Sequence, residues 1–339
     1  MSTLYVDRRD ASLDVQDGTL VVRLNGARIA AAPLALLERV VLRGHMMLST
    51  SLISALYRNG AGLFVLSGRT GEPSGSLLGR PGGDALVRLG QMRLHADPQQ
   101  RLALAQRVVR AKLSASLHAL EKMDPSPGAD RRALLDARRA LPGFLARAAE
   151  ADSIAALTGI EGAAAAAYFR AFGAAFPPSL RFAVRSRRPP RDPANALLSL
   201  GYTLATFEAA RCAVLAGLDP LIGFLHALAH GRPSLACDLV EPARPRIDLW
   251  ALSLFREHGL RADHFRRHGE ACLLGKAGRA LVYQAWEEHR AVLLRRAFGL
   301  WCRSLARTAR AAAAAEAEAA EQPEIPEFEH DDGGTDAVS

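Results

Sequence analysis

Through the first 82 residues of the chain, apolar residues alternate with polar ones or form short runs. Such patterns, when bounded by turn residues, are typical of β-strands. Asp17 and Asn25 are each followed by glycine, a pairing that favours tight hairpin turns. One helix is expected at Ser49–Tyr57, because an Asn-Gly pair at 59–60 can end it. The segment 1–82 is therefore predicted to be a small, mainly β domain, with strands at Thr3–Val6, Ser12–Val15, Thr19–Leu24, Leu37–Leu42 and Gly62–Leu66.

The hydrophobic period changes after residue 82. Leu102, Ala105 and Val108 recur at the three- to four-residue spacing of a helix that buries one face. The run GRPGGD at 79–84 indicates a connection between domains, and residues 83–90 are assigned to the linker. Residues 91–310 are predicted to form a larger, almost wholly α-helical domain, so the fold class is α+β. Its further helices are expected at about 130–148, at 151–172, from Pro193 onward and at 277–310.

Charge divides the chain into two parts. Residues 311–339 contain nine acidic residues and no Lys or Arg, and with so few apolar residues they are predicted to be a disordered acidic tail. Residues 1–310 carry 43 basic and 26 acidic residues, a net charge of +17. A domain this basic favours a polyanionic partner such as nucleic acid. The alternative is an arginine-rich composition without such a partner, since the chain has only three lysines.

Targeting and redox signals are absent from the sequence. The start, MSTLYVDRRD, is charged where a signal peptide needs an apolar run, and no segment reaches the roughly 18 apolar residues of a membrane span. A cytoplasmic protein with no membrane contact is expected. The four cysteines match no metal-binding or redox spacing and are predicted to be reduced core residues: Cys212, Cys237, Cys272 and Cys302.

One imidazole and two carboxylates fall within sixteen residues in the run GFLHALAHGRPSLACDLVEP. Asp238 and Glu241 are three positions apart, so they would share one face of a helix, and Ser234 suits the N-cap of that helix. A turn at 231–233 would let the chain double back and bring His226 to the carboxylates. Such a ligand set favours magnesium or manganese, with zinc less favoured because no HExxH or cysteine pair accompanies it. Ordinary surface or core roles for these side chains are the alternative reading.

Three motifs occur in a specific order in the second domain: GIEGAAAAAYFRAF, then RRPPRDPANALLSLGYTL, then GLDPLIGFLHALAHGRPSLACDLVEPARP. Preceded by a small β domain, this order closely resembles the CRISPR-associated spacer-integration endonuclease family, the universal adaptation subunit of CRISPR systems. The resemblance covers residues 1 to about 305. It implies a metal-dependent DNA endonuclease and integrase, in which the 3′-hydroxyl of a captured fragment attacks a phosphodiester of a CRISPR array.

The resemblance also implies a metal site and partners. Glu161, His226 and Glu241 match the family's Mg²⁺ or Mn²⁺ ligands, which are also its catalytic residues. Asp238 matches an additional acidic position beside the site. Many members have Asp where this chain has Glu241, so which carboxylate of the pair reaches the metal stays open. The implied partners are double-stranded and branched DNA, a second copy of the chain, and a small ferredoxin-like companion subunit; the β domain would serve dimerisation and DNA contact.

Further polar residues near the motifs are candidates for supporting roles. Asn195, Ser199 and Tyr202 form a polar stripe at helical spacing, which could orient metal ligands or form a hydrogen-bonded core network. Basic residues could hold DNA phosphates without reading bases, or could simply be solvated. The basic candidates are Arg187, Arg188, Arg191, Arg232 and Lys276.

Two other functions are compatible with the same residues. A non-catalytic scaffold would use the basic surface to hold DNA while another protein performs the chemistry. A general nuclease for branched DNA would use the same ligands with water as the nucleophile. Affinity that falls with salt is expected of all three, because phosphate contacts release counterions, so it does not discriminate among them.

Overall fold

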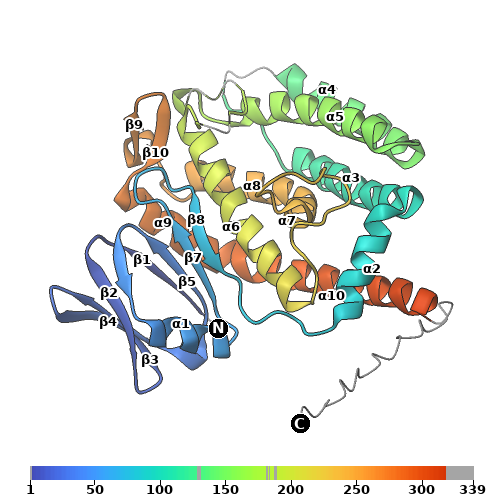
Figure 1. The fold of residues 1–339 in the computed structure, drawn as a ribbon. Helices are drawn as coiled ribbons and strands as arrows, with labels where there is room; N and C mark the ends of the chain where they lie inside the picture. Colours follow the sequence, from blue (N-terminus) through green and yellow to red (C-terminus); the bar gives the residue numbers. More distant parts are fainter. Residues whose placement is uncertain (1, 128–130, 181, 183, 187–188, 318–339) are drawn as a thin grey trace, which may run out of the picture.

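The computed structural model describes residues 2–127, 131–180, 182, 184–186 and 189–317. A small β-rich part comes first and a larger helical part follows, as predicted (Figure 1). Most of the predicted acidic tail, 318–339, lies outside the described residues. Its first residues, 311–317, continue the last helix, so the helix is longer than expected. The predicted linker also contains structure, because residues 85–90 form the first half of helix α2 (Ala85–Ala96).

Two four-stranded sheets build the N-terminal part. The first has the order β1-β5-β7-β8 and the second the order β4-β3-β2-β6. The five predicted strands are present, together with three that were not predicted. The bounds are β1 Ser2–Asp7, β2 Ala11–Gln16, β3 Thr19–Leu24, β4 Ala27–Pro33, β5 Leu37–Arg43, β6 Met46–Leu48, β7 Gly62–Leu66 and β8 Pro73–Leu77, with helix α1 at Thr50–Arg58 between β6 and β7.

The three unpredicted strands lie at sheet edges. β4 pairs with β3 through an exposed alanine-rich segment, which carries no alternation to detect. β8 begins inside the run GRTGEPSG, predicted to be a loop, and pairs antiparallel with β7. Proline is tolerated at a sheet edge, where its missing N–H interrupts no ladder. Leu13, Leu20, Val40 and Leu56 are fully buried in one core shared by the two sheets and α1.

The helical part is organised around one buried helix, α6 (Pro193–Leu215), which runs through its centre (Figure 1). Asp192 caps this helix by accepting a hydrogen bond from the Asn195 amide at 2.8 Å, and Pro193 is its first residue, as the sequence predicts. The other helices are α2, α3 Pro98–Glu121, α4 Arg131–Glu150, α5 Ile154–Ala175, α7 Ser234–Val240, α8 Arg244–Arg256, α9 Lys276–Trp286 and α10 Val292–Ala317.

Two features differ from the predicted helical pattern. Phe265–His268 (β9) and Ala271–Leu274 (β10) form an antiparallel hairpin within the helical part. The helix expected at 277–310 is interrupted by a π-helical segment, Glu287–Ala291, between α9 and α10. The π-helical segment carries Glu287, whose carboxylate accepts hydrogen bonds from Tyr5 at 2.8 Å and from Arg39 at 3.1 Å. The π segment thereby meets the first sheet.

Candidate metal centre

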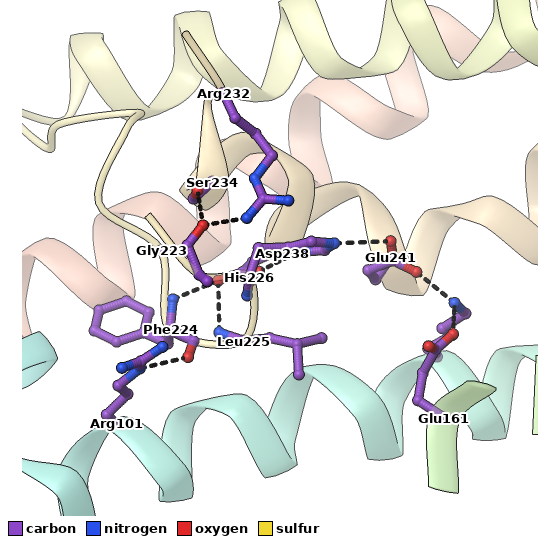
Figure 2. A network of polar contacts seen from close by, with 12 residues as sticks. Arg101, Glu161, Gly223, Phe224, Leu225, His226, Arg232, Ser234, Asp238 and Glu241 are labelled. Atoms are coloured by element: carbon purple, nitrogen blue, oxygen red, sulfur yellow. Dashed lines mark hydrogen bonds and ion pairs between the residues drawn. The ribbon is translucent and has the colours of Figure 1, made fainter. Parts of the chain in front are cut away.

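Two carboxylates from distant parts of the chain meet at one lysine. Glu161 lies on α5 and Glu241 directly follows α7, and their side chains point toward one another (Figure 2). Lys112 on α3 contacts Oε1 of Glu161 and Oε2 of Glu241 through its Nζ atom. The exposed fraction of the side chain is 20% for Glu161, 6% for Glu241 and 13% for Lys112. Two carboxylates in a partly buried site repel each other unless a positive charge lies between them, and here the ammonium supplies it.

His226 is the third member of this group. Its Nε2 atom lies 3.8 Å from Oε1 of Glu241, and its side chain is 26% exposed. The segment that carries it is an irregular loop between α6 and α7, so the imidazole is placed by loop contacts. The predicted residues Glu161, His226 and Glu241 are thus brought to one region from three separate segments.

Asp238 holds the histidine loop rather than facing the lysine. Its Oδ2 atom accepts hydrogen bonds from the amides of Phe224 and Leu225, and Oδ1 accepts from the His226 amide at 3.0 Å (Figure 2). Oδ1 also lies 2.6 Å from Nδ1 of His226. A carboxylate can only accept, so Nδ1 carries a proton, and Nε2 is the nitrogen that faces Glu241. Histidines that bind metals are commonly held in this way by a carboxylate on the opposite nitrogen.

The approach of the loop to Asp238 depends on Gly223. A Cβ atom at this position would lie 2.7 Å from Oδ2 of Asp238 and 2.6 Å from the backbone of Ser234. Ser234 does not cap α7, contrary to the sequence prediction, because its hydroxyl donates to the carbonyl of Ala227 at 3.0 Å. The Arg232 guanidinium donates to the same carbonyl. Both side chains therefore stabilise the loop that carries His226.

Arg244 sets the charge state of Glu241. Burial alone would raise the pKa of the Glu241 carboxyl, but the positive charges of Arg244 and Lys112 outweigh it and lower the pKa to about 2. The Nε atom of Arg244 forms an ion pair with Oε1 of Glu241 at 2.9 Å. Its guanidinium carbon also lies 4.6 Å from the ring centroid of Tyr202, a cation–π contact. Glu241 is therefore ionised throughout the neutral range.

The predicted polar stripe on α6 divides into two roles. Asn195 and Ser199 accept hydrogen bonds from Arg185 at 2.7 and 3.2 Å, and so fasten the basic loop that precedes the helix. Tyr202 contacts Arg244 with its ring and donates its hydroxyl hydrogen to Asp248. Tyr202 thus directly contacts Arg244, the ion-pair partner of Glu241.

Asp248 is a fully buried carboxyl between two tyrosines. It accepts hydrogen bonds from Tyr168 at 3.0 Å and from Tyr202, and burial outweighs these bonds to raise its pKa to about 6. The folded protein therefore holds a proton there that the unfolded chain releases at lower pH. The stabilisation from this group is complete below the ordinary aspartate pKa, and it is lost as the pH rises through about 6.

Replacing Asp248 with asparagine is expected to remove this pH dependence, because the amide stays neutral. Between pH 4 and pH 7 the wild type should lose about 3 kcal/mol of unfolding free energy that the variant keeps. Urea unfolding at the two pH values measures the difference. Asp263→Asn, at an exposed position, is the control and should follow the wild type. Identical pH dependence in Asp248→Asn and the wild type would contradict the assignment.

The basic candidates for phosphate contact are spread over the helical part. Arg187 and Arg188 lie outside the described residues. Arg191 is exposed and lies 3.6 Å from the carboxylate of Glu270. Lys276 is exposed at the first position of α9. Arg232, as described above, holds the histidine loop.

Lys112 and Arg244 were not among the sequence candidates. Arg244 lies three residues after Glu241, a spacing that brings side chains together on a helix. Lys112 carries a weaker signal: it is one of only three lysines among 43 basic residues. Neither residue has a motif of its own, and only folding places Lys112 beside Glu161 and Glu241.

The described residues include no group of three or more His, Cys, Asp or Glu side chains already arranged to hold a metal ion. In this structure the Lys112 ammonium lies between Glu161 and Glu241. The donor set itself suits a hard divalent cation: two carboxylates and an imidazole whose second nitrogen is held by Asp238. The donor types of these side chains therefore fit such a cation.

Two carboxylates and a histidine gathered in a basic domain are a donor set that can hold a divalent cation beside a phosphodiester. Residues 4–288 match the family model described as CRISPR associated protein Cas1, and the chain belongs to this family. The resemblance found in the sequence is thereby confirmed.

Relatives of known name agree with the family. The chain is 36% identical over 292 residues to CRISPR-associated endonuclease Cas1 3 of Thermus thermophilus, covering 85% of this chain and 84% of the relative. It is 36% identical over 309 residues to CRISPR-associated endonuclease Cas1 2 of Rhodospirillum rubrum, covering 88% and 89%. These relatives are named endonucleases, so nuclease activity is the function class that the family indicates.

Solved structures show the same fold. A CAS1 protein from Thermotoga maritima superposes with a TM-score of 0.79 at 21% identity, covering 91% of this chain and 97% of that one. A casposase bound to its integration product gives a TM-score of 0.78 at 22% identity, covering 92% and 91%. The predicted α+β class is therefore confirmed.

Among the described residues, no helix is both long and apolar enough to span a membrane.

Proposed function

We propose that this protein is a divalent-metal-dependent DNA endonuclease and integrase that inserts captured DNA fragments into a CRISPR array. The observation that carries the proposal is the convergence of Glu161, His226 and Glu241 from three segments of a chain that belongs to the Cas1 family. The casposase bound to an integration product shares the fold and supports DNA joining as the reaction.

Glu161, His226 and Glu241 would hold Mg²⁺ or Mn²⁺. When bound, the cation would polarise a phosphodiester and make the attacking 3′-hydroxyl more acidic. Asp238 orients the His226 ring through its contact with Nδ1, so that Nε2 faces the site. Arg244 keeps Glu241 ionised and in position. Both contributions exist before substrate arrives, which lowers the cost of organising the site.

DNA and two protein partners complete the proposal. The net charge of +17 over residues 1–310 suits contact with the phosphates of double-stranded and branched DNA. We assign dimerisation and DNA contact to the β domain, residues 1–82, and catalysis to the helical domain, residues 91–310. Solved complexes described as Cas6-RT-Cas1–Cas2 contain a chain of this fold, which supports assembly with a small companion subunit. That subunit is expected to be ferredoxin-like, as the family resemblance implies.

An integration assay tests the function directly. The protein and its companion subunit are mixed with a labelled duplex and a supercoiled plasmid that carries a repeat array. Covalent joining is expected with Mg²⁺ or Mn²⁺ and a free 3′-hydroxyl, and it should vanish with EDTA or with 3′-deoxy ends. Joining that persists in EDTA would contradict a metal centre. DNA binding without metal uptake or joining would favour the scaffold, and faster cleavage of forks than joining to arrays would favour a general branched-DNA nuclease.

A further inference from the structure

Lys112 is a partly buried cation whose position a metal site alone does not explain. It projects from α3, and its ammonium contacts one oxygen of Glu161 and one oxygen of Glu241. Its side chain is 13% exposed, and the Glu241 side chain only 6%. The two carboxylates come from elements that follow Lys112 by 49 and 129 residues in the chain. Tertiary folding therefore builds a site for a single positive charge between them.

The electrostatics of this group favour one cation at that point, either the ammonium or a metal ion. Two carboxylates that share a partly buried site repel each other strongly unless a positive charge separates them. Arg244 already pairs with Oε1 of Glu241, while Lys112 takes Oε2. Glu161 has Lys112 as its ion-pair partner among the described residues. Removal of the ammonium would leave Glu161 and one oxygen of Glu241 available to another cation.

Lysine is a residue type that can move out of a position between two carboxylates. An ammonium on a flexible four-carbon stem is a compact point charge, whereas the planar guanidinium of arginine forms fixed bidentate pairs. This chain uses arginine at nearly all of its basic positions, yet it has lysine here. A lysine can fill the space of one ion between two carboxylates and then withdraw along its stem.

We propose that Lys112 is an internal counter-cation that holds the Glu161 and Glu241 carboxylates together and competes with the divalent metal for them. This inference rests on the metal centre of the proposed function. In the metal-free protein the ammonium keeps both carboxylates in place. A divalent cation binds by displacing it, so Lys112 weakens the affinity of the site for metal while it preserves the arrangement of the ligands.

Manganese binding by the full-length protein tests the competition. Lys112→Met keeps an unbranched side chain only one atom shorter and removes its charge. Titration of Mn²⁺, followed by the electron paramagnetic resonance signal of the free ion, should show about tenfold or tighter binding to this variant than to the wild type. Loss of a unit charge a few ångströms from the metal is sufficient for such a change at an effective dielectric constant of about 20. In EDTA the same variant should melt a few degrees lower, because Glu161 then loses its ion-pair partner and Glu241 keeps only Arg244.

One further variant is a control for the measurement, and another can replace Lys112→Met. Lys122→Met removes a charge from the exposed C-cap of the same helix and should leave Mn²⁺ affinity unchanged. Lys112→Gln serves in place of Lys112→Met if circular dichroism shows that the methionine variant is unfolded, and the same tightening is expected. Unchanged or weaker Mn²⁺ binding by the folded Lys112 variants would overturn the proposal.

The outcomes separate this inference from the proposed function. If the wild type binds Mn²⁺ and Glu161→Gln abolishes binding, the metal centre stands, and the Lys112 variants alone decide the competition. If Lys112→Met binds Mn²⁺ and the wild type does not, the competition is supported in its strongest form. If none of these proteins binds Mn²⁺, both the metal centre and the competition are overturned.

Discussion

Replacing Glu241 with glutamine is expected to lower the rate of DNA joining on the order of 10³-fold, because a metal ion contributes several kcal/mol of transition-state stabilisation. The glutamine amide keeps one oxygen donor but loses the negative charge that attracts the cation. Lys112 and Arg244 would also lose their shared acidic partner. Single-turnover joining of a labelled duplex to a repeat plasmid, at saturating Mg²⁺, measures the loss.

Glu257→Gln provides a matched control for this result. Glu257 is an exposed residue at the C-terminal end of α8, so the same chemical change there should leave joining unaffected. Circular dichroism and a melting curve establish that Glu241→Gln is folded. A folded Glu241→Gln protein that joins DNA within a few-fold of the wild-type rate would exclude Glu241 as a metal ligand. The neighbouring carboxylate of Asp238 would then need to be reconsidered.

Replacing Asp238 with alanine should damage both stability and activity. The change leaves the amides of Phe224, Leu225 and His226 without their acceptor inside the protein. Each buried donor left unsatisfied costs about 1–3 kcal/mol, so a loss of about 4 kcal/mol in unfolding free energy is expected. That is a large fraction of the 5–15 kcal/mol that typically stabilises a domain. Urea unfolding at constant pH gives the value.

Activity of the same variant tests the role of Asp238 as a positioning residue. Without its carboxylate the His226 ring loses the partner of Nδ1, and losses of about 10- to 100-fold in metal affinity or joining are typical of such changes. Asp238→Asn should retain part of the stability, since its carbonyl oxygen can still accept a hydrogen bond. Asp263→Ala, at an exposed site, is the control. Wild-type stability in Asp238→Ala would refute the hydrogen-bonding role seen in the structure.

Local patterns in the sequence predicted the elements that bury one face. The strands β1, β2, β3, β5 and β7 were found because their apolar residues alternate or form short runs against the core shared by the sheets. The start of α6 at Asp192 and Pro193 followed from capping chemistry alone. The strands that the pattern missed, such as β4 and the β9–β10 hairpin, form through backbone pairing along exposed or short segments. Their side chains therefore carry little periodic signal.

The candidate site was predictable only in part. Residue types and spacing pointed to His226, Asp238 and Glu241, whereas Glu161 came from the family resemblance. Ser234 was misread as a helix cap, because its hydroxyl bonds to a loop carbonyl that local sequence does not place nearby. The different roles of Asp238 and Glu241 were open in the sequence, where both are acidic residues on one face of a helix.

The linear chain already contained the change from strand-forming to helix-forming periodicity near residue 82, the excess of positive charge in residues 1–310 and the motifs that identify the family. These depend on composition, periodicity and the order of residue types, which the linear chain contains. Tertiary structure decided that Asp238 faces the amides of the histidine loop, and that Glu241 meets Glu161 across Lys112. Those contacts join residues up to 129 positions apart. Which buried charges become neighbours depends on the packing of α3, α5 and α7, and no local pattern in the chain specifies that packing.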